Sequence, residues 1–188
     1  MHTRFRKALI ITCCCLLTVI AFAQSGTDSL FTGVAHFRLG DPQSKFGDSL
    51  TLAMDSQYVS VTDPKYAPYP YSYKGAKPDL LNKEIVPFQS FVVWFDEKKI
   101  LTQLYFTNLY GVEYGYPTVS IGVRHYKRLL DYFTDKTKQP AKKVVYPKSK
   151  GYVTEGYEWN VPHVQLILES QYDTVLKHLS ISVYLKKK

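Results

Sequence analysis

Apolar and polar residues alternate along several stretches of this chain, a spacing that is typical of β-strands with one buried face. Residues 91–95 and 100–107 flank the polar turn 96–99 and predict a hairpin with a four-residue loop. If Phe95 pairs with Ile100, one face of this hairpin is apolar and the other is mixed. The apolar face then carries Phe91, Val93, Phe95, Ile100, Leu104 and Phe106, and the mixed face carries Val92, Trp94, Leu101, Gln103 and Tyr105.

A second hairpin is predicted for residues 152–159 and 162–169, with its turn at Asn160 and Val161. Pairing Trp159 with Pro162 again gathers the apolar side chains on one face of the hairpin. It places Trp159 in the core with Val153, Tyr157, Val164, Leu166 and Leu168. Residues 175–185 predict a last strand, in which Leu179, Ile181, Val183 and Leu185 alternate with His178, Ser180, Ser182 and Tyr184.

Helical spacing predicts a long helix over residues 119–137, which ends before Gln139 and Pro140. Near the start of the chain, a strand over 33–39 leads into a shorter helix over 42–54, for which Asp41 is the expected N-cap. A further strand is predicted over 58–61. Residues 62–84 are rich in Tyr and Pro and are predicted to form a loop, because closely spaced prolines do not fit the interior of a sheet.

This order of elements predicts an α+β fold, in which antiparallel meanders form a sheet and two helices pack on one of its faces. Two copies of a β-α-β-β unit are compatible with the order. The 16 Tyr and 10 Phe residues also favour a β-rich structure, because aromatic residues are enriched in strands. We expect residues 31–188 to form a single domain, with the mixed face of the sheet turned to solvent or to a partner.

Residues 1–23 have the three parts of a secretory signal peptide: basic residues at 4, 6 and 7, an apolar run over 8–23, and the small residues Ala21 and Ala23 at a cleavage site. They predict an exported protein, periplasmic or extracellular, that keeps no transmembrane segment after cleavage. An uncleaved anchor is the alternative, although the run is shorter than the ~20 residues that span a bilayer. The three cysteines lie within this run, and residues 24–30 are expected to be disordered.

Three stretches resemble small bacterial envelope proteins that share the helix-on-sheet fold of the β-lactamase-inhibitor protein and of the small outer-membrane assembly lipoproteins. They are residues 39–42 (Leu-Gly-Asp-Pro), residues 129–133 before Gln139-Pro140, and the Trp159 hairpin with the strand that follows it. The resemblance covers about two-thirds of the chain. It implies a non-catalytic protein-binding role, although the chain has no lipobox cysteine and its Tyr/Pro-rich stretch has no counterpart.

The sequence gives little support to catalysis. Glu155 and Glu158 are the most suggestive carboxylate pair, but an odd spacing puts them on opposite faces of a regular strand. No nucleophile elbow, phosphate-binding glycine motif or metal-ligand spacing is present, and we therefore predict no catalytic residues, no metal and no cofactor. Four histidines follow the predicted signal peptide: His36, His125, His163 and His178. His163 and His178, on the mixed face, are interpreted as solvated polar residues rather than metal ligands.

Six lysines between residues 136 and 150 form a basic cluster. For an exported protein, such a cluster would attract anionic glycans or lipid headgroups rather than nucleic acid, but a solvated, lysine-rich loop is the simpler interpretation. Its members are Lys136, Lys138, Lys142, Lys143, Lys148 and Lys150.

The leading hypothesis is a secreted or periplasmic binding domain that recognises a protein or a glycan through the mixed sheet face and Tyr-rich loops. The alternatives are a small cell-wall or polysaccharide hydrolase and a purely structural envelope component. The predicted binding residues are Trp94, Leu101, Gln103, Tyr105, His178 and Tyr184.

Overall fold

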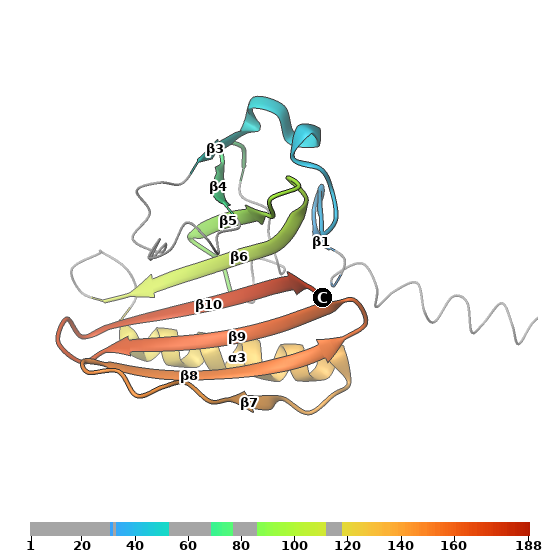
Figure 1. The fold of residues 1–188 in the computed structure, drawn as a ribbon. Helices are drawn as coiled ribbons and strands as arrows, with labels where there is room; N and C mark the ends of the chain where they lie inside the picture. Colours follow the sequence, from blue (N-terminus) through green and yellow to red (C-terminus); the bar gives the residue numbers. More distant parts are fainter. Residues whose placement is uncertain (1–30, 32, 53–68, 77–85, 112–117) are drawn as a thin grey trace, which may run out of the picture.

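The computed structural model describes residues 31, 33–52, 69–76, 86–111 and 118–188 (Figure 1). The predicted signal peptide 1–23, the segment 24–30 and the predicted strand 58–61 lie outside these residues. Most of the predicted loop 62–84 lies outside them as well.

The chain is α+β, and strands dominate. One eight-stranded antiparallel sheet has the order β3-β4-β5-β6-β10-β9-β8-β7. It consists of two four-stranded meanders, which meet where β6 pairs with β10 (Figure 1). The strands are β3 (Leu50–Leu52), β4 (Tyr69–Tyr73), β5 (Ser90–Phe95), β6 (Leu101–Tyr110), β7 (Lys142–Val144), β8 (Tyr152–Val161), β9 (Val164–Asp173) and β10 (His178–Lys187).

The predicted long helix is confirmed as α3 (Val119–Thr137), which lies behind β8, β9 and β10 in Figure 1. Leu129 and Phe133 are buried on it, and the Phe133 ring lies 5.6 Å from the ring of Trp159. Gly122 allows its first turns to approach the sheet closely, because a Cβ there would come within 2.8 Å of Leu179 and Tyr110. Lys138 ends the helix in the left-handed conformation.

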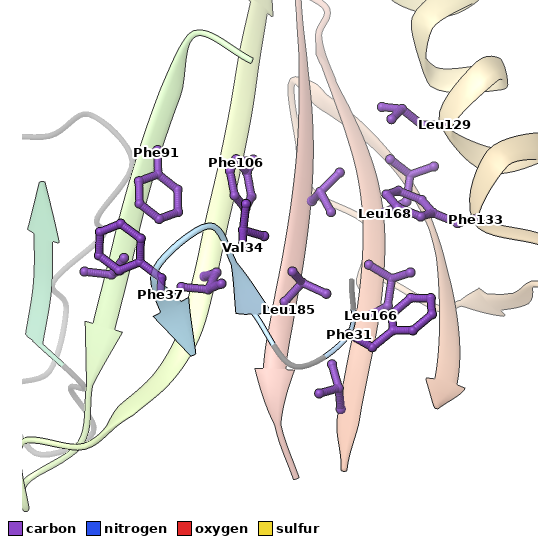
Figure 2. Close-up of a cluster of buried hydrophobic side chains, with 14 of the residues drawn as sticks. Phe31, Val34, Phe37, Phe91, Phe106, Leu129, Phe133, Leu166, Leu168 and Leu185 are labelled. Atoms are coloured by element: carbon purple, nitrogen blue, oxygen red, sulfur yellow. The ribbon is translucent and has the colours of Figure 1, made fainter. Parts of the chain in front are cut away.

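The predicted strand 33–39 is wrong. A tight turn at Ala35 and His36 separates β1 (Gly33–Val34) from β2 (Phe37–Arg38), and Val34 pairs with Phe37. In one straight strand these two side chains would point to opposite faces, whereas the turn buries both of them. Figure 2 shows Val34 and Phe37 beside Phe91 and Phe106, on the face of the sheet that α3 covers.

The predicted helix 42–54 is also wrong. Only the 3-10 helix η1 (Gln43–Ser49) forms, it is broken at Gly47, and the chain then joins the sheet as β3. Asp41 does not cap it. Its Oδ2 instead accepts hydrogen bonds from the backbone N–H of Arg38 (3.0 Å) and from Nζ of Lys45 (2.7 Å).

Part of the predicted Tyr/Pro loop is a strand. Tyr69–Tyr73 forms β4, in which Pro70 pairs with Trp94. On its other side, the described residues of β3 pair with β4 from Tyr71 onwards, so within the described part of the chain Pro70 lies at an edge of the sheet. An edge is the position in a sheet where a missing N–H is tolerated.

Both hairpins form, and the first turns at the predicted residues 96–99, but the turn of the second is misplaced and both predicted registers are wrong. In the second hairpin Trp159 pairs with Leu166 and the turn is at Pro162 and His163, which shifts the register by four residues. An even shift leaves every side chain on its predicted face, and the buried position of Trp159 is confirmed. In the first hairpin a bulge after Trp94 makes Leu101, rather than Ile100, the partner of Phe95.

Candidate functional site

The face of the sheet turned away from α3, here called the open face, faces the viewer in Figure 1. The strand registers align one row of side chains across six strands of this face. From β5 to β7 this row is Val92, Tyr105, Tyr184, Ile167, Glu158 and Lys142. The first four residues of the row are aromatic or apolar, and the last two, Glu158 and Lys142, form an ion pair.

Tyr105 and Tyr184 form the centre of the row, with ring centroids 4.8 Å apart. The hydroxyl of Tyr105 lies 3.0 Å from Oγ of Ser182, and Ser182 in turn donates to Thr107 at 3.3 Å. The hydroxyl of Tyr184 lies 3.5 Å from Oε1 of Glu169. Burial, with smaller contributions from Tyr105 and Glu169, raises the pKa of Tyr184, so this phenol stays protonated at neutral pH.

The carboxylate of Glu158 is held by one hydrogen bond from each neighbouring strand. It accepts hydrogen bonds from Nζ of Lys142 (2.9 Å) and from Nε2 of Gln165 (2.7 Å), and these bonds hold the pKa of its carboxyl below the ordinary range. Glu158 is therefore a carboxylate at neutral pH. A general acid needs the opposite, a carboxyl with a raised pKa.

Tyr146 reaches the open face from the segment after β7, and sequence reasoning missed it. It packs over Gly156, where a Cβ would come within 2.5 Å of its hydroxyl. Burial and a hydrogen bond to Glu169 raise the pKa of Tyr146. A glycine inside a strand often marks such a close approach, and Gly156 was the available signal in the sequence.

Four predicted binding residues gather on this face. Trp94 pairs with Gln103, beside the row that contains Tyr105 and Tyr184. Trp94 is half-buried, and its Nε1–H is buried without a hydrogen-bond partner in the described part of the chain. Nζ of Lys186, the cross-strand partner of Gln103, lies 5.3 Å from the centroid of the Tyr184 ring.

Two predicted residues are not part of this group. Leu101 is completely buried on the covered face, because the bulge in the first hairpin turns its side chain into the core. The prediction that His178 is solvated is wrong, because its side chain is buried and packs against Gly111. It lies six residues before Tyr184 on β10, a separation of about 20 Å along a strand.

Glu155 and Glu158 point to opposite faces, as their spacing predicted: Glu155 pairs across the strand with Ser170 and Glu158 with Ile167. Glu155 accepts a hydrogen bond from the hydroxyl of Tyr157 and lies 3.5 Å from Nζ of Lys143. Within the ranges that the structure describes, no group of three His, Cys, Asp or Glu side chains is arranged to hold a metal ion.

The lysine cluster is divided among several contacts. Lys142 binds Glu158, Lys138 binds Asp135 at 2.6 Å, and Nζ of Lys136 lies 5.6 Å from the ring centroid of Tyr132. Lys148 and Lys150 are exposed at one end of the sheet.

No helix in the described residues is long and apolar enough to cross a membrane. Comparisons with family models, with curated proteins and with solved structures found no match to this chain.

Proposed function

We propose that this chain is an exported, non-catalytic binding protein, periplasmic or extracellular, that recognises a protein or glycan partner through its open face. The observation that carries the proposal is the aromatic row centred on Tyr105 and Tyr184, with Trp94 beside it. Large aromatic side chains with a polar tip dominate the energetics of many interfaces. Export is part of the proposal and rests on the sequence of residues 1–23.

A protein fits this face better than a single sugar does. The row crosses six strands, and neighbouring strands lie about 4.8 Å apart, so its width is about 24 Å. That width is typical of the patch that a protein partner covers, at about 800 Å² on each side. The half-buried Trp94 is a suitable anchor at one end of the patch.

The electrostatics of the face favour binding over the alternative of a cell-wall or polysaccharide hydrolase. Glu158 is held ionised, and Tyr146 and Tyr184 are held protonated. Groups fixed in one protonation state offer hydrogen bonds of constant polarity to a partner. A carboxyl kept ionised is not the general acid with a raised pKa that glycoside hydrolysis requires.

The resemblance to envelope proteins with the fold of the β-lactamase-inhibitor protein belongs to the same proposal. It is supported by the helix-on-sheet arrangement and by the two four-stranded meanders, each of which follows a helical element, η1 or α3. We take β2-η1-β3-β4 and β6-α3-β7-β8 as the β-α-β-β units of an internal duplication. Phe46 of η1 packs against Phe37 and Phe95, as a helix on the covered face would.

The proposal is tested by affinity capture from the native envelope with the wild-type protein and with Trp94→Ala and Tyr105→Ala. We expect each substitution to weaken capture of a specific partner by about 30-fold, which corresponds to about 2 kcal/mol for an interface anchor. Val123→Ala is the matched control, because Val123 is an exposed apolar residue of α3 on the other side of the sheet.

Circular dichroism of the variants distinguishes the outcomes. If Trp94→Ala unfolds the protein, the open face is a second core and the proposed site is wrong. If a partner is captured equally by all variants, it binds elsewhere. Release of the captured partner by free glycan would instead identify the ligand as a glycan.

A further inference from the structure

Two connections meet at the end of the sheet opposite the C-terminus (Figure 1). One is the segment between β7 and β8, and the other is the turn between β9 and β10. Thr174 of the turn donates hydrogen bonds from its backbone N–H (2.8 Å) and its hydroxyl (3.0 Å) to the carbonyl oxygen of Gly151. We call residues 145–153 and 174–177 the tip.

The tip carries an unusual concentration of exposed apolar side chains. Val175 is 75% exposed and Leu176 is 54% exposed. Of the large apolar residues that are exposed in the described part of the chain, only Leu52 and Val123 lie elsewhere. The other tip members are Val145, Tyr152 and Val153.

A hydrogen-bonded turn presents Val175 and Leu176. Oδ1 of Asp173 accepts hydrogen bonds from the backbone N–H groups of Val175 (2.8 Å) and Leu176 (2.9 Å). Because this turn is fixed before any contact is made, presenting the two side chains costs little conformational entropy.

The same two segments of the tip carry three lysines: Lys148, Lys150 and Lys177. All three are exposed, and none is paired with an acidic side chain among the residues that the structure describes. A hollow of about 320 Å³ between residues 146–149 and residues 152–154 opens beside Lys148. The tip therefore combines apolar projections with unpaired positive charge.

We propose that the tip docks on an anionic lipid surface. Apolar side chains that enter the headgroup region gain the free energy of leaving water, and lysines beside them gain from the negative surface potential. Tyrosine suits the same boundary, because its ring is apolar and its hydroxyl is polar. A soluble polyanion would satisfy the lysines but would leave Val175 and Leu176 in water.

This inference is independent of the proposed partner site. Val175, Leu176 and the three lysines lie at the ends of the strands, whereas the aromatic row runs across their middle, and only Tyr146 belongs to both regions. A protein docked by its tip would hold the strands away from the membrane and leave the open face accessible.

The test is co-sedimentation of the protein, as its host processes it, with vesicles of phosphatidylcholine alone or mixed with phosphatidylglycerol. We expect binding to the mixed vesicles only. Replacing the tip lysines by Lys148→Gln, Lys150→Gln and Lys177→Asn should weaken binding by about 100-fold, since each lysine contributes about fivefold. Asparagine is chosen at position 177 because Lys177 has a φ of 58°, which asparagine tolerates.

Val175→Ser with Leu176→Ser should weaken binding to the mixed vesicles by at least about tenfold, because the hydroxymethyl group inserts less favourably than the aliphatic side chains. The matched control removes the same charge away from the tip, through Lys74→Gln, Lys98→Gln and Lys127→Gln. Its effect should stay below about threefold, because distant charges are screened by salt.

Three results would overturn the proposal: no binding to the mixed vesicles, tip variants that bind like the control, or a Val175→Ser, Leu176→Ser variant that binds like the wild type. The last result, together with full release by dextran sulfate, would identify the tip as a site for soluble polyanions. Far-UV circular dichroism confirms that each variant is folded.

Discussion

The two faces of the sheet are both extensively buried, but they differ in what is buried. On the covered face the inaccessible side chains are almost all hydrocarbon, among them Phe106, Trp159 and Ile181. On the open face Thr107 and Ser182 are almost as inaccessible, and they form a chain of hydrogen bonds with Tyr105, which is 9% exposed. Burial alone therefore does not locate the core, because polar groups can be buried at little cost when they are paired.

This difference has an energetic consequence. Hydrocarbon removed from water contributes about 25 cal/mol per Å², whereas a paired hydrogen bond contributes only about 1 kcal/mol net. We therefore expect the covered face to determine the stability of the fold. The open face keeps polar groups and aromatic rings at which a partner can bind.

The largest expected effect is a difference in stability between variants of the two tryptophans. Trp159→Ala should lower the free energy of unfolding by about 3–5 kcal/mol, because it leaves a cavity between β8 and α3. Trp94→Ala should cost only about 1 kcal/mol, because Trp94 is half-buried. Urea denaturation of both variants measures the difference, and equal losses would show that the two faces are equivalent cores.

The stability of the fold should depend on pH through one polar contact on the covered face. Asn108 donates to the hydroxyl of Tyr110 (3.1 Å), which lies 2.9 Å from Nδ1 of His125 and can donate to it when the imidazole is neutral. Nδ1 can accept only when the imidazole is neutral. Burial, assisted by Arg128 and Arg124, lowers the pKa of His125, and burial raises that of Tyr110 to about 12.

The sign of this effect follows from proton linkage. As pH falls below about 6.5, the unfolded chain protonates His125 while the folded chain resists, so the folded state loses stability. We expect the urea midpoint to fall between neutral and mildly acidic pH, and His125→Phe to reduce that dependence. A midpoint that is equally pH-dependent in the variant would assign the effect to other groups.

The smallest effect concerns the ion pair at the end of the row. Lys142 is largely exposed, so Lys142→Ala should change the free energy of unfolding by less than about 1 kcal/mol. The carboxyl of Glu158 has a lowered pKa, and its contribution is therefore present above the ordinary carboxyl pKa and lost under acid. A larger loss at neutral pH would show that the open face also supports the fold.

Much of the sheet followed from the alternation of side chains. Residues of the last strand, such as Ile181 and Tyr184, lie on their predicted faces. Side chains alternate between the two faces along a strand, whichever strands it pairs with. The spacing also predicted α3 with its correct ends. The prediction of a helix over residues 42–54 was wrong for two reasons. Gly47 interrupts the short helix η1, and Leu50–Leu52 then joins the sheet as strand β3.

The sequence alone determined which side chains share a face within each strand, because that depends only on local geometry. The tertiary structure decided which strands lie side by side and where each turn falls. It therefore placed Leu101 in the core through a bulge, and it put Tyr146 over Gly156. The row from Val92 to Lys142 exists only because six strands pair in one order, and such long-range pairings leave no periodic signal in the sequence.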